Sequence, residues 1–215
     1  FHEGQQVRIL TRTAQVRGVV TVKSTHLQRG RVANAPLATL DDLWVDVGAT
    51  SRAEVKQLGI EMLDPVVSNG AFNSFADFVS GQLAGVRVGC AAVASAAAGQ
   101  VKNGETIFLL TTLRSFGHDG LEAALRNLGR VDEVTLLDQI DAPATSESVL
   151  QRKVDKPAYL PESTGLTSLT MLAPRVRFAG TLVESVSLTD AGKLLTAVEK
   201  AAGVEISPRD RWQFA

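Results

Sequence analysis

The sequence predicts an α/β protein with a small β-domain at its front, on the strength of three observations. Residues 1–72 alternate short β-branched runs with polar turns, a pattern typical of a small barrel or sandwich. From residue 73 onward, helical periods alternate with short continuous apolar runs. The chain has 215 residues, 45% of them hydrophobic, which is enough for a substantial buried core. We therefore expect a small β-barrel or sandwich domain over 1–72 and an α/β domain over 73–215.

The front domain is predicted to contain four short strands and one helix. The strands are expected at 7–10, 15–22, 43–48 and 64–67. A helix should lie between the last two strands, because Ser51 and Glu54 have the spacing of a capping box. Gly59 stands where a helix of that length would end.

The second domain is predicted to alternate strands and helices. Helices are expected over 86–98, 121–128 and 187–203, and strands over 105–112, 133–138, 168–172 and 177–179. The apolar run 107–110 is typical of a strand buried on both faces, so 105–138 is interpreted as a strand–helix–strand unit. The polar stretch 139–165 contains three prolines and is expected to be a long excursion.

Composition excludes several classes of protein. With 22 basic and 23 acidic residues, the net charge of -1 gives no electrostatic footprint for nucleic acid or for a membrane surface. No apolar stretch reaches the roughly 18 residues of a membrane span. Cys90 is the only cysteine, which excludes an internal disulfide and favours a cytoplasmic location, and its apolar run predicts a buried thiol. The start at Phe1, without Met, indicates a processed or partial product.

Generic catalytic motifs are not found in the sequence. It contains no dinucleotide fingerprint, P-loop, zincin motif or nucleophile elbow. The three histidines, His2, His26 and His118, are too far apart in sequence to form a local metal cluster, and His26 is expected in a turn or on the surface.

A whole-chain pattern is more informative. LDDLWVDVGA over 40–49, AEVKQLG over 53–59, DPVV over 64–67 and RVGCA over 87–91 occur in this order, and VESVSLTD over 183–190 precedes the last helix. This pattern resembles the glutamyl and tetrahedral aminopeptidase family, which includes proteins once called endoglucanases. The resemblance implies a metallopeptidase-like α/β sandwich with an inserted β-barrel domain used for homo-oligomer assembly. It also implies that the N-terminal portion of the peptidase domain, with an early His-x-Asp ligand pair, is absent from this chain.

The family's chemistry requires two divalent metals, zinc or cobalt, held by histidine and carboxylates. The resemblance places Gly85 at the family's bridging aspartate and Gly180 at its late histidine. It places Arg114 at the general base and Ser115 at the adjacent glutamate ligand. Glycine has no side chain to offer, and arginine is not a proton acceptor at working pH. These substitutions leave no residue that we assign as catalytic.

Asp138 is the one ligand position that the resemblance retains, and a strand-end or capping role remains the alternative for it. His118 and Asp119 are the only nearby residues that could complete a metal site with it, and Asp119 also suits a helix N-terminus. We therefore expect an aminopeptidase homologue without metal cofactors, kept for fold, assembly or binding. The alternative is an active, zinc- or cobalt-dependent aminopeptidase of peptides seen as a partial chain. A third possibility is an anion site at Arg114 and Arg87.

Overall fold

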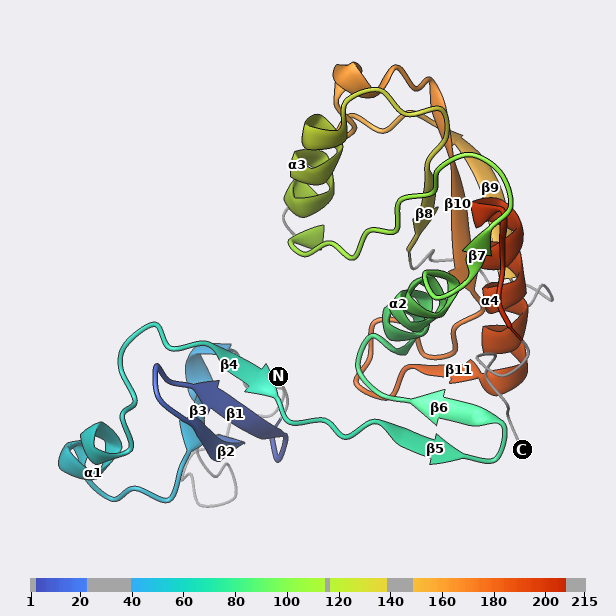
Figure 1. The fold of residues 1–215 in the computed structure, drawn as a ribbon. Helices are drawn as coiled ribbons and strands as arrows, with labels where there is room; N and C mark the ends of the chain where they lie inside the picture. The colour runs from blue at the N-terminus through green and yellow to red at the C-terminus, as the bar shows by residue number, and fades with distance from the viewer. Residues whose placement is uncertain (1–2, 23–39, 115–116, 139–148, 208–215) are drawn as a thin grey trace, which may run out of the picture. The chain divides into compact units, whose positions relative to one another are not determined.

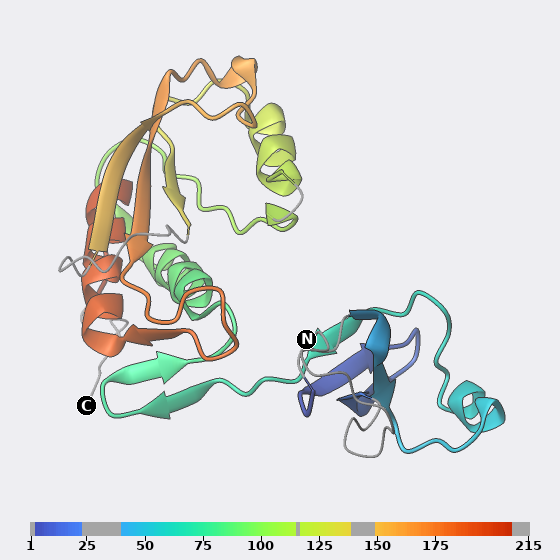
Figure 2. The same ribbon diagram turned by 180° about the vertical axis from the view of Figure 1, so that it is seen from behind.

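The structure is a computed structural model, and it describes residues 3–22, 40–114, 117–138 and 149–207. The chain divides into two compact units, Phe1–Ala71 and Phe72–Ala215. Figures 1 and 2 show the elements of both units from opposite sides. Within the described residues, no helix combines the length and the apolar character needed to cross a bilayer.

The first unit is built on one antiparallel sheet with the strand order β3-β2-β1-β4. Its strands are β1 (Gln6–Leu10), β2 (Gln15–Val22), β3 (Leu43–Asp46) and β4 (Val66–Ser68). All four expected strands are confirmed, with ends within two residues. Successive side chains of a strand point to opposite faces, so Val7, Ile9 and Val20 are buried together on one face of the sheet.

The expected closed barrel is corrected to an open sheet. In the described part of the first unit, β3 and β4 are the two edges and do not pair with each other. Four strands, one of only three residues, provide too little tilted sheet to close around a filled interior. The β-rich character of this unit is right, and its barrel closure is not observed.

Helix α1 (Arg52–Gln57) begins as the capping box predicts. The Ser51 hydroxyl accepts a hydrogen bond from the Glu54 amide at 3.3 Å, and the Glu54 carboxylate accepts one from the Thr50 amide at 2.7 Å. In a standard capping box the glutamate accepts from the amide of the N-cap residue, here Ser51. Glu54 instead accepts from the amide of Thr50, the residue before the N-cap. Gly59 has φ +74°, a left-handed conformation that glycine adopts without strain, and the helix ends just before it.

These bonds make the start of α1 dependent on pH. The amide and hydroxyl of Thr50 hold the pKa of Glu54 below its ordinary value. A carboxyl group whose pKa is lowered by folding stabilises the folded state above its unfolded pKa, and that contribution is lost as the pH falls through the folded pKa. We expect Glu54→Gln to speed amide exchange in α1 at neutral pH, with the difference from wild type vanishing in acid. Glu105→Gln, at an exposed position of the second unit, is the control, and a pH-independent difference would contradict the assignment.

The second unit has its main core between a three-stranded sheet and two helices. The sheet order is β8-β10-β9, with β10 parallel to β8 and antiparallel to β9. Its strands are β8 (Thr135–Leu137), β9 (Val149–Asp155) and β10 (Ser168–Pro174). Helices α2 (Ala84–Ala96) and α4 (Leu188–Ala202) lie side by side against β10 (Figure 1). The buried core residues are Ala84, Val88, Ala92, Ala96, Leu172, Val186, Ala191, Leu194, Leu195, Val198, Val204 and Ile206.

Two expectations for this core need correction. Helix α2 is buried on one stripe only, and Cys90 lies on its exposed side. The alanine-rich sequence looks apolar all round, but a helix of small residues buries only the face that its neighbours cover. The stretch 139–165 also contains β9, which pairs with β10 along its whole length. Its polar outward residues concealed this strand, and 139–148 lie outside the described residues.

Helix α3 (Asp119–Leu128) covers a second, smaller core. It contributes Leu121 and Leu125, which pack with Leu160 and Leu169. The expected helix over 121–128 is thus confirmed, and the strand expected over 133–138 is found as the shorter β8.

The strand expected over 105–112 is wrong within this structure. The segment forms no strand, and its outward residues Ile107 and Leu110 are 49% and 63% exposed. Phe108 packs against the main core, and the Thr106 hydroxyl donates to the Ala202 carbonyl at 2.9 Å. An apolar run signals burial, but a strand also needs a neighbouring backbone with which to pair. None pairs with it among the described residues.

A third sheet leads into α4. It has the order β11-β6-β5, with β5 (Asn73–Phe75), β6 (Phe78–Ser80) and β11 (Ser185–Ser187). A further short pair joins β7 (Gln100–Val101) to β12 (Val204–Glu205). The strand expected over 177–179 is reduced to a single bridge between Arg177 and Ser185.

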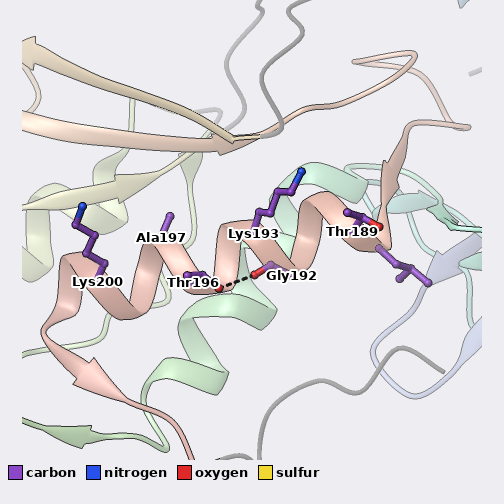
Figure 3. Close-up of a pocket in the computed structure, with 7 residues that line it drawn as sticks. Thr189, Gly192, Lys193, Thr196, Ala197 and Lys200 are labelled. Carbon is purple, nitrogen blue, oxygen red and sulfur yellow. Dashed lines mark hydrogen bonds between the residues drawn. The ribbon is translucent and has the colours of Figure 1, made fainter.

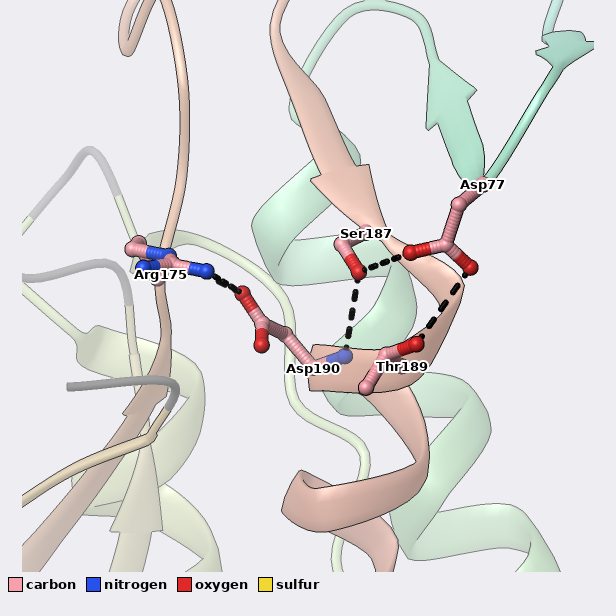
Figure 4. Close-up of polar contacts among 5 residues, drawn as sticks. All are labelled: Asp77, Arg175, Ser187, Thr189 and Asp190. Atoms are coloured by element: carbon pink, nitrogen blue, oxygen red, sulfur yellow. Dashed lines mark hydrogen bonds and ion pairs between the residues drawn. The ribbon is translucent and has the colours of Figure 1, made fainter. Parts of the chain in front are cut away.

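Hydrogen bonds between polar side chains connect the N-terminus of α4 to Asp77, just before β6 (Figure 4). Ser187 caps the helix, accepting from the Asp190 amide at 3.3 Å and donating to Asp77 at 2.6 Å. Asp190 is buried and forms an ion pair with Arg175 at 3.0 Å. The predicted start and the stop at Gly203 are both confirmed. The Ser187 hydroxyl thus provides an acceptor for an amide in the first turn of α4. We therefore assign these polar side chains a structural role at the helix N-terminus.

Candidate functional site

Asp138 lies at the carboxyl edge of the parallel strands β8 and β10. It follows β8 directly, and its amide continues the pairing by donating to the Leu172 carbonyl at 3.2 Å. Its side chain is only 9% exposed. The carboxyl edge of parallel strands is where α/β folds place ligand-binding groups, so the position suits a functional carboxylate.

Two cationic or ionisable side chains face this carboxylate. The Arg114 guanidinium donates through Nε to Oδ1 of Asp138 at 2.5 Å. His118 places Nε2 at 4.0 Å from Oδ2, and its ring stacks on Tyr159 with centroids 4.3 Å apart. Burial, followed by the negative charge of Asp138, raises the pKa of the Tyr159 phenol. Asp138 therefore already has a cationic partner at Oδ1.

Glu184 is a fully buried carboxylate that contacts both of the glycines at family ligand positions. Its Oε1 accepts a hydrogen bond from the Gly85 amide at 2.7 Å, and its Oε2 accepts one from the Gly180 amide at 3.1 Å. Gly85 belongs to the first turn of α2, so Glu184 satisfies an amide at that helix terminus. The two glycines that match ligand positions thus bind the same carboxylate through their backbones.

Each glycine is unsuited to a ligand side chain for a different reason, Gly85 by its packing and Gly180 by its backbone conformation. A Cβ atom at Gly85 would lie 2.7 Å from Val176 Cγ2 and 3.3 Å from Glu184 Oε1. Gly180 has φ +75°, a conformation that residues with a side chain rarely adopt. The packing at Gly85 and the backbone conformation at Gly180 therefore both disfavour a side chain that could bind a metal.

The residues that the structure describes do not fit a two-metal centre. Among the described residues, no group of three or more histidine, cysteine, aspartate or glutamate side chains lies close enough to hold a metal ion. His118 and Asp138 do come together, but Asp119 does not complete a site with them. Ser115 lies outside the described residues, as do His2 and His26.

The possible anion site at Arg114 and Arg87 gains no support. The Arg87 Nε donates to the Gln82 carbonyl at 3.0 Å, whereas Arg114 is bound to Asp138. Each guanidinium therefore has its own partner within the chain.

Sequence reasoning missed two residues of this region. Tyr159 is the only tyrosine of the chain, but it lies in the stretch interpreted as an excursion. Glu184 was part of the C-terminal pattern, yet nothing local to it indicates that it binds amides 99 and 4 residues away. A buried acceptor for a helix terminus is visible only once the fold brings the partners together.

A surface hollow of about 480 Å³ lies along α4, and neither Asp138 nor Glu184 lines it. Its lining residues are Leu188, Thr189, Gly192, Lys193, Thr196, Ala197 and Lys200 (Figure 3). The lining has two lysines but no carboxylate, imidazole or thiol. It offers no metal ligand and no acid–base pair.

The described strands and helices form a mixed α/β fold that solved peptidase structures share. An aminopeptidase from Desulfurococcus kamchatkensis aligns over 93% of this chain and 68% of its own, with 17% identity and a TM-score of 0.71. The TET1 peptidase of Pyrococcus horikoshii aligns over 93% and 72%, with 18% identity and a TM-score of 0.71. An endoglucanase from Thermotoga maritima aligns over 93% and 68%, with 12% identity and a TM-score of 0.65. At these identities the likeness establishes the fold.

The family itself follows from the sequence. The pattern of the M42 glutamyl aminopeptidases matches residues 1–151, more than half of the chain. The chain belongs to the M42 glutamyl aminopeptidase family, and the resemblance derived from the sequence is confirmed.

Proposed function

We propose that this chain is an M42 aminopeptidase homologue that has lost its catalytic metals and is retained for its fold, its assembly or its binding surfaces. The observation that carries the proposal is the shared use of Glu184 by Gly85 and Gly180. A dinuclear site needs carboxylate and imidazole side chains converging on two ions. At these two positions the chain presents backbone amides, which donate hydrogen bonds and cannot bind a cation.

The ion pair of Arg114 and Asp138 supports the same conclusion. The Arg114 guanidinium, at 2.5 Å, neutralises the nearly buried negative charge of the Asp138 carboxylate. An incoming divalent cation would have to displace it and then share the space with a positive charge. Asp138 therefore acts in this proposal as the structural partner of Arg114.

The test measures metal and activity together. We expect the purified chain, incubated with zinc or cobalt and desalted, to retain close to no metal and to turn over no aminoacyl anilide. Asp138→Asn is the matched variant, because it removes the only retained ligand position with little change in volume. Wild type and Asp138→Asn should be indistinguishable in metal content by mass spectrometry and in turnover. About two metals per chain with turnover, both lost in Asp138→Asn, would overturn the proposal in favour of an active peptidase of peptides.

Assembly is the second part of the proposal. The Pyrococcus horikoshii TET1 peptidase assembles into a tetrahedron or a large octahedral shell. For this chain we propose a homo-oligomer formed through the first unit, in a cytoplasmic setting that suits a single thiol, Cys90.

A further inference from the structure

Two arginines lie directly opposite each other on one face of the sheet in the first unit. Arg8 of β1 and Arg17 of β2 are partners in the strand register. Because side chains alternate along a strand, this face lies opposite the one that buries Val7, Ile9 and Val20. We call Arg8 and Arg17 the arginine pair.

The hydrogen-bond pattern of the two strands sets the arginine pair close together. The Val20 amide donates to the Gln5 carbonyl at 2.9 Å, and the Thr11 amide donates to the Ala14 carbonyl at 3.0 Å. Bonded and non-bonded pairs alternate along antiparallel strands, so the arginine pair, three positions from each of these bonds, is of the non-bonded kind. The Cα atoms of such a pair are only about 4.5 Å apart, and its side chains are the closer ones. Like charges in direct opposition destabilise a sheet, so the pair lowers stability unless negative charge compensates it.

The donors of both guanidinium groups are incompletely used. Arg8 Nη1 donates to Oε1 of Gln15 at 2.8 Å, which holds one end of the group in place. The buried Nε atom of Arg8 has no hydrogen-bond partner among the described residues. The side chain of Arg17 is exposed, and it too has no acceptor in that part of the chain. The edge of Arg8 that carries Nε and the whole fork of Arg17 therefore remain for a ligand.

No carboxylate of the described strands neutralises the arginine pair. Asp46 is the one acidic residue at a described strand position of this face, and it lies diagonal to Arg17 because its register partner is Val19. Asp46 accepts a hydrogen bond from the Gly48 amide at 2.7 Å and forms no ion pair with either arginine. A buried polar atom without a partner indicates a bound water or ion. Beside two positive charges, the group that fits is an anion.

We propose that the arginine pair binds a tetrahedral oxyanion of the phosphate type, either free phosphate or the phosphate group of a small monoester. Guanidinium forks match phosphate oxygens in a bidentate manner. A tetrahedral dianion presents separate oxygens to two forks, whereas a carboxylate has two oxygens in one plane and a single charge. Because Arg17 is exposed, the anion reaches the pair from solvent. The inference concerns the first unit and does not depend on the proposed function.

The test is a titration of the full, ¹⁵N-labelled chain with inorganic phosphate at constant pH and ionic strength. The Nε–H resonances of the arginine pair are expected to shift and to saturate, and sulfate should compete, whereas acetate at the same concentration should not. Phosphate should also raise the thermal unfolding midpoint above its value in chloride of equal ionic strength, because a ligand of the folded state stabilises it.

Substitutions of Arg17 separate the fork from the charge. Arg17→Gln should weaken phosphate binding about tenfold or more, since it removes one set of charge-assisted hydrogen bonds. Arg17→Lys keeps the charge but has a single ammonium group, so it should lie between wild type and Arg17→Gln. Arg12→Gln is the matched control, because it removes the same charge from the turn between the same strands, where Arg12 pairs with Glu61 and is 82% exposed. Its phosphate affinity should equal that of wild type.

Stability without phosphate is a second readout. Arg17→Gln should then be at least as stable as wild type, because the repulsion within the arginine pair is gone. Circular dichroism of each variant verifies that it folds.

Repeating the titration with O-phosphoserine distinguishes the two sources of the anion. Binding as tight as that of inorganic phosphate would support a monoester group as the ligand, and binding of inorganic phosphate alone would support the free anion. The absence of a saturable shift with either compound would overturn the site. Equal loss of affinity in Arg12→Gln and Arg17→Gln would overturn it as well, because general charge attraction would then explain the binding.

Discussion

Restoring the family's aspartate as Gly85→Asp is expected to lower the free energy of unfolding by about 3 kcal/mol or more. An aspartate in the first turn of a helix ordinarily gains up to about 1 kcal/mol from the helix dipole. Here its Cβ would lie 2.7 Å from Val176 Cγ2, and its carboxylate would be buried beside Glu184. Overpacking costs about 1–3 kcal/mol, and a second buried negative charge adds to it. The unfavourable contributions therefore outweigh the dipole.

Urea denaturation followed by circular dichroism measures this effect, and α2 provides a matched control. Gly89 lies one turn after Gly85, and a Cβ there would meet Leu137 at an ordinary 3.7 Å. Gly89→Ala should be neutral or stabilising by up to about 1 kcal/mol, because alanine has the higher helix propensity. Adding Val176→Ala to Gly85→Asp should recover part of the lost stability. A Gly85→Asp protein as stable as wild type would show that the helix start has room for a ligand, against the proposed function.

Removal of the buried carboxylate by Glu184→Ala is expected to cost about 3–5 kcal/mol. The side chain is fully buried, and both of its oxygens accept backbone amides. Each hydrogen bond to a charged group contributes about 1.5–3 kcal/mol, and its loss leaves a buried amide without a partner. A cavity remains where the side chain was.

Glu184→Gln tests whether the two hydrogen bonds carry this stability. It keeps the volume and one acceptor oxygen but turns an amide donor toward the second N–H group, so about half of the loss is expected. Glu162→Ala is the surface control, since that side chain is 99% exposed in its pair with Lys156 and should change stability by less than about 0.5 kcal/mol. Equal stability of Glu184→Ala and Glu162→Ala would contradict the proposal that the hydrogen bonds of Glu184 stabilise the fold.

The elements that sequence reasoning predicted well depend on local signals. The strands of the first unit follow from β-branched alternation, and α1 follows from Ser51 and Glu54 three residues apart. The elements it predicted wrongly depend on a distant partner. The run over 105–112 has the composition of a strand but no paired neighbour, and β9 is polar yet pairs along all of β10.

For the candidate site too, the residue types could be identified from the sequence, but their distant contacts could not. Residue identity alone showed that Gly85, Arg114 and Gly180 cannot supply the side chains of metal ligands or of a general base. It could not show that Arg114 binds Asp138, 24 residues away, or that Glu184 binds Gly85, 99 residues away.

The sequence by itself determined the family and most of the local elements, because each of these depends on which residues stand close together along the chain. Only the tertiary structure decided that the described strands of the front sheet form no closed barrel, that Cys90 is exposed, and that one buried glutamate accepts hydrogen bonds from both glycines. Burial, packing space and hydrogen-bond partners are set by contacts between residues far apart in the chain. Those contacts exist only after the strands and helices have come together.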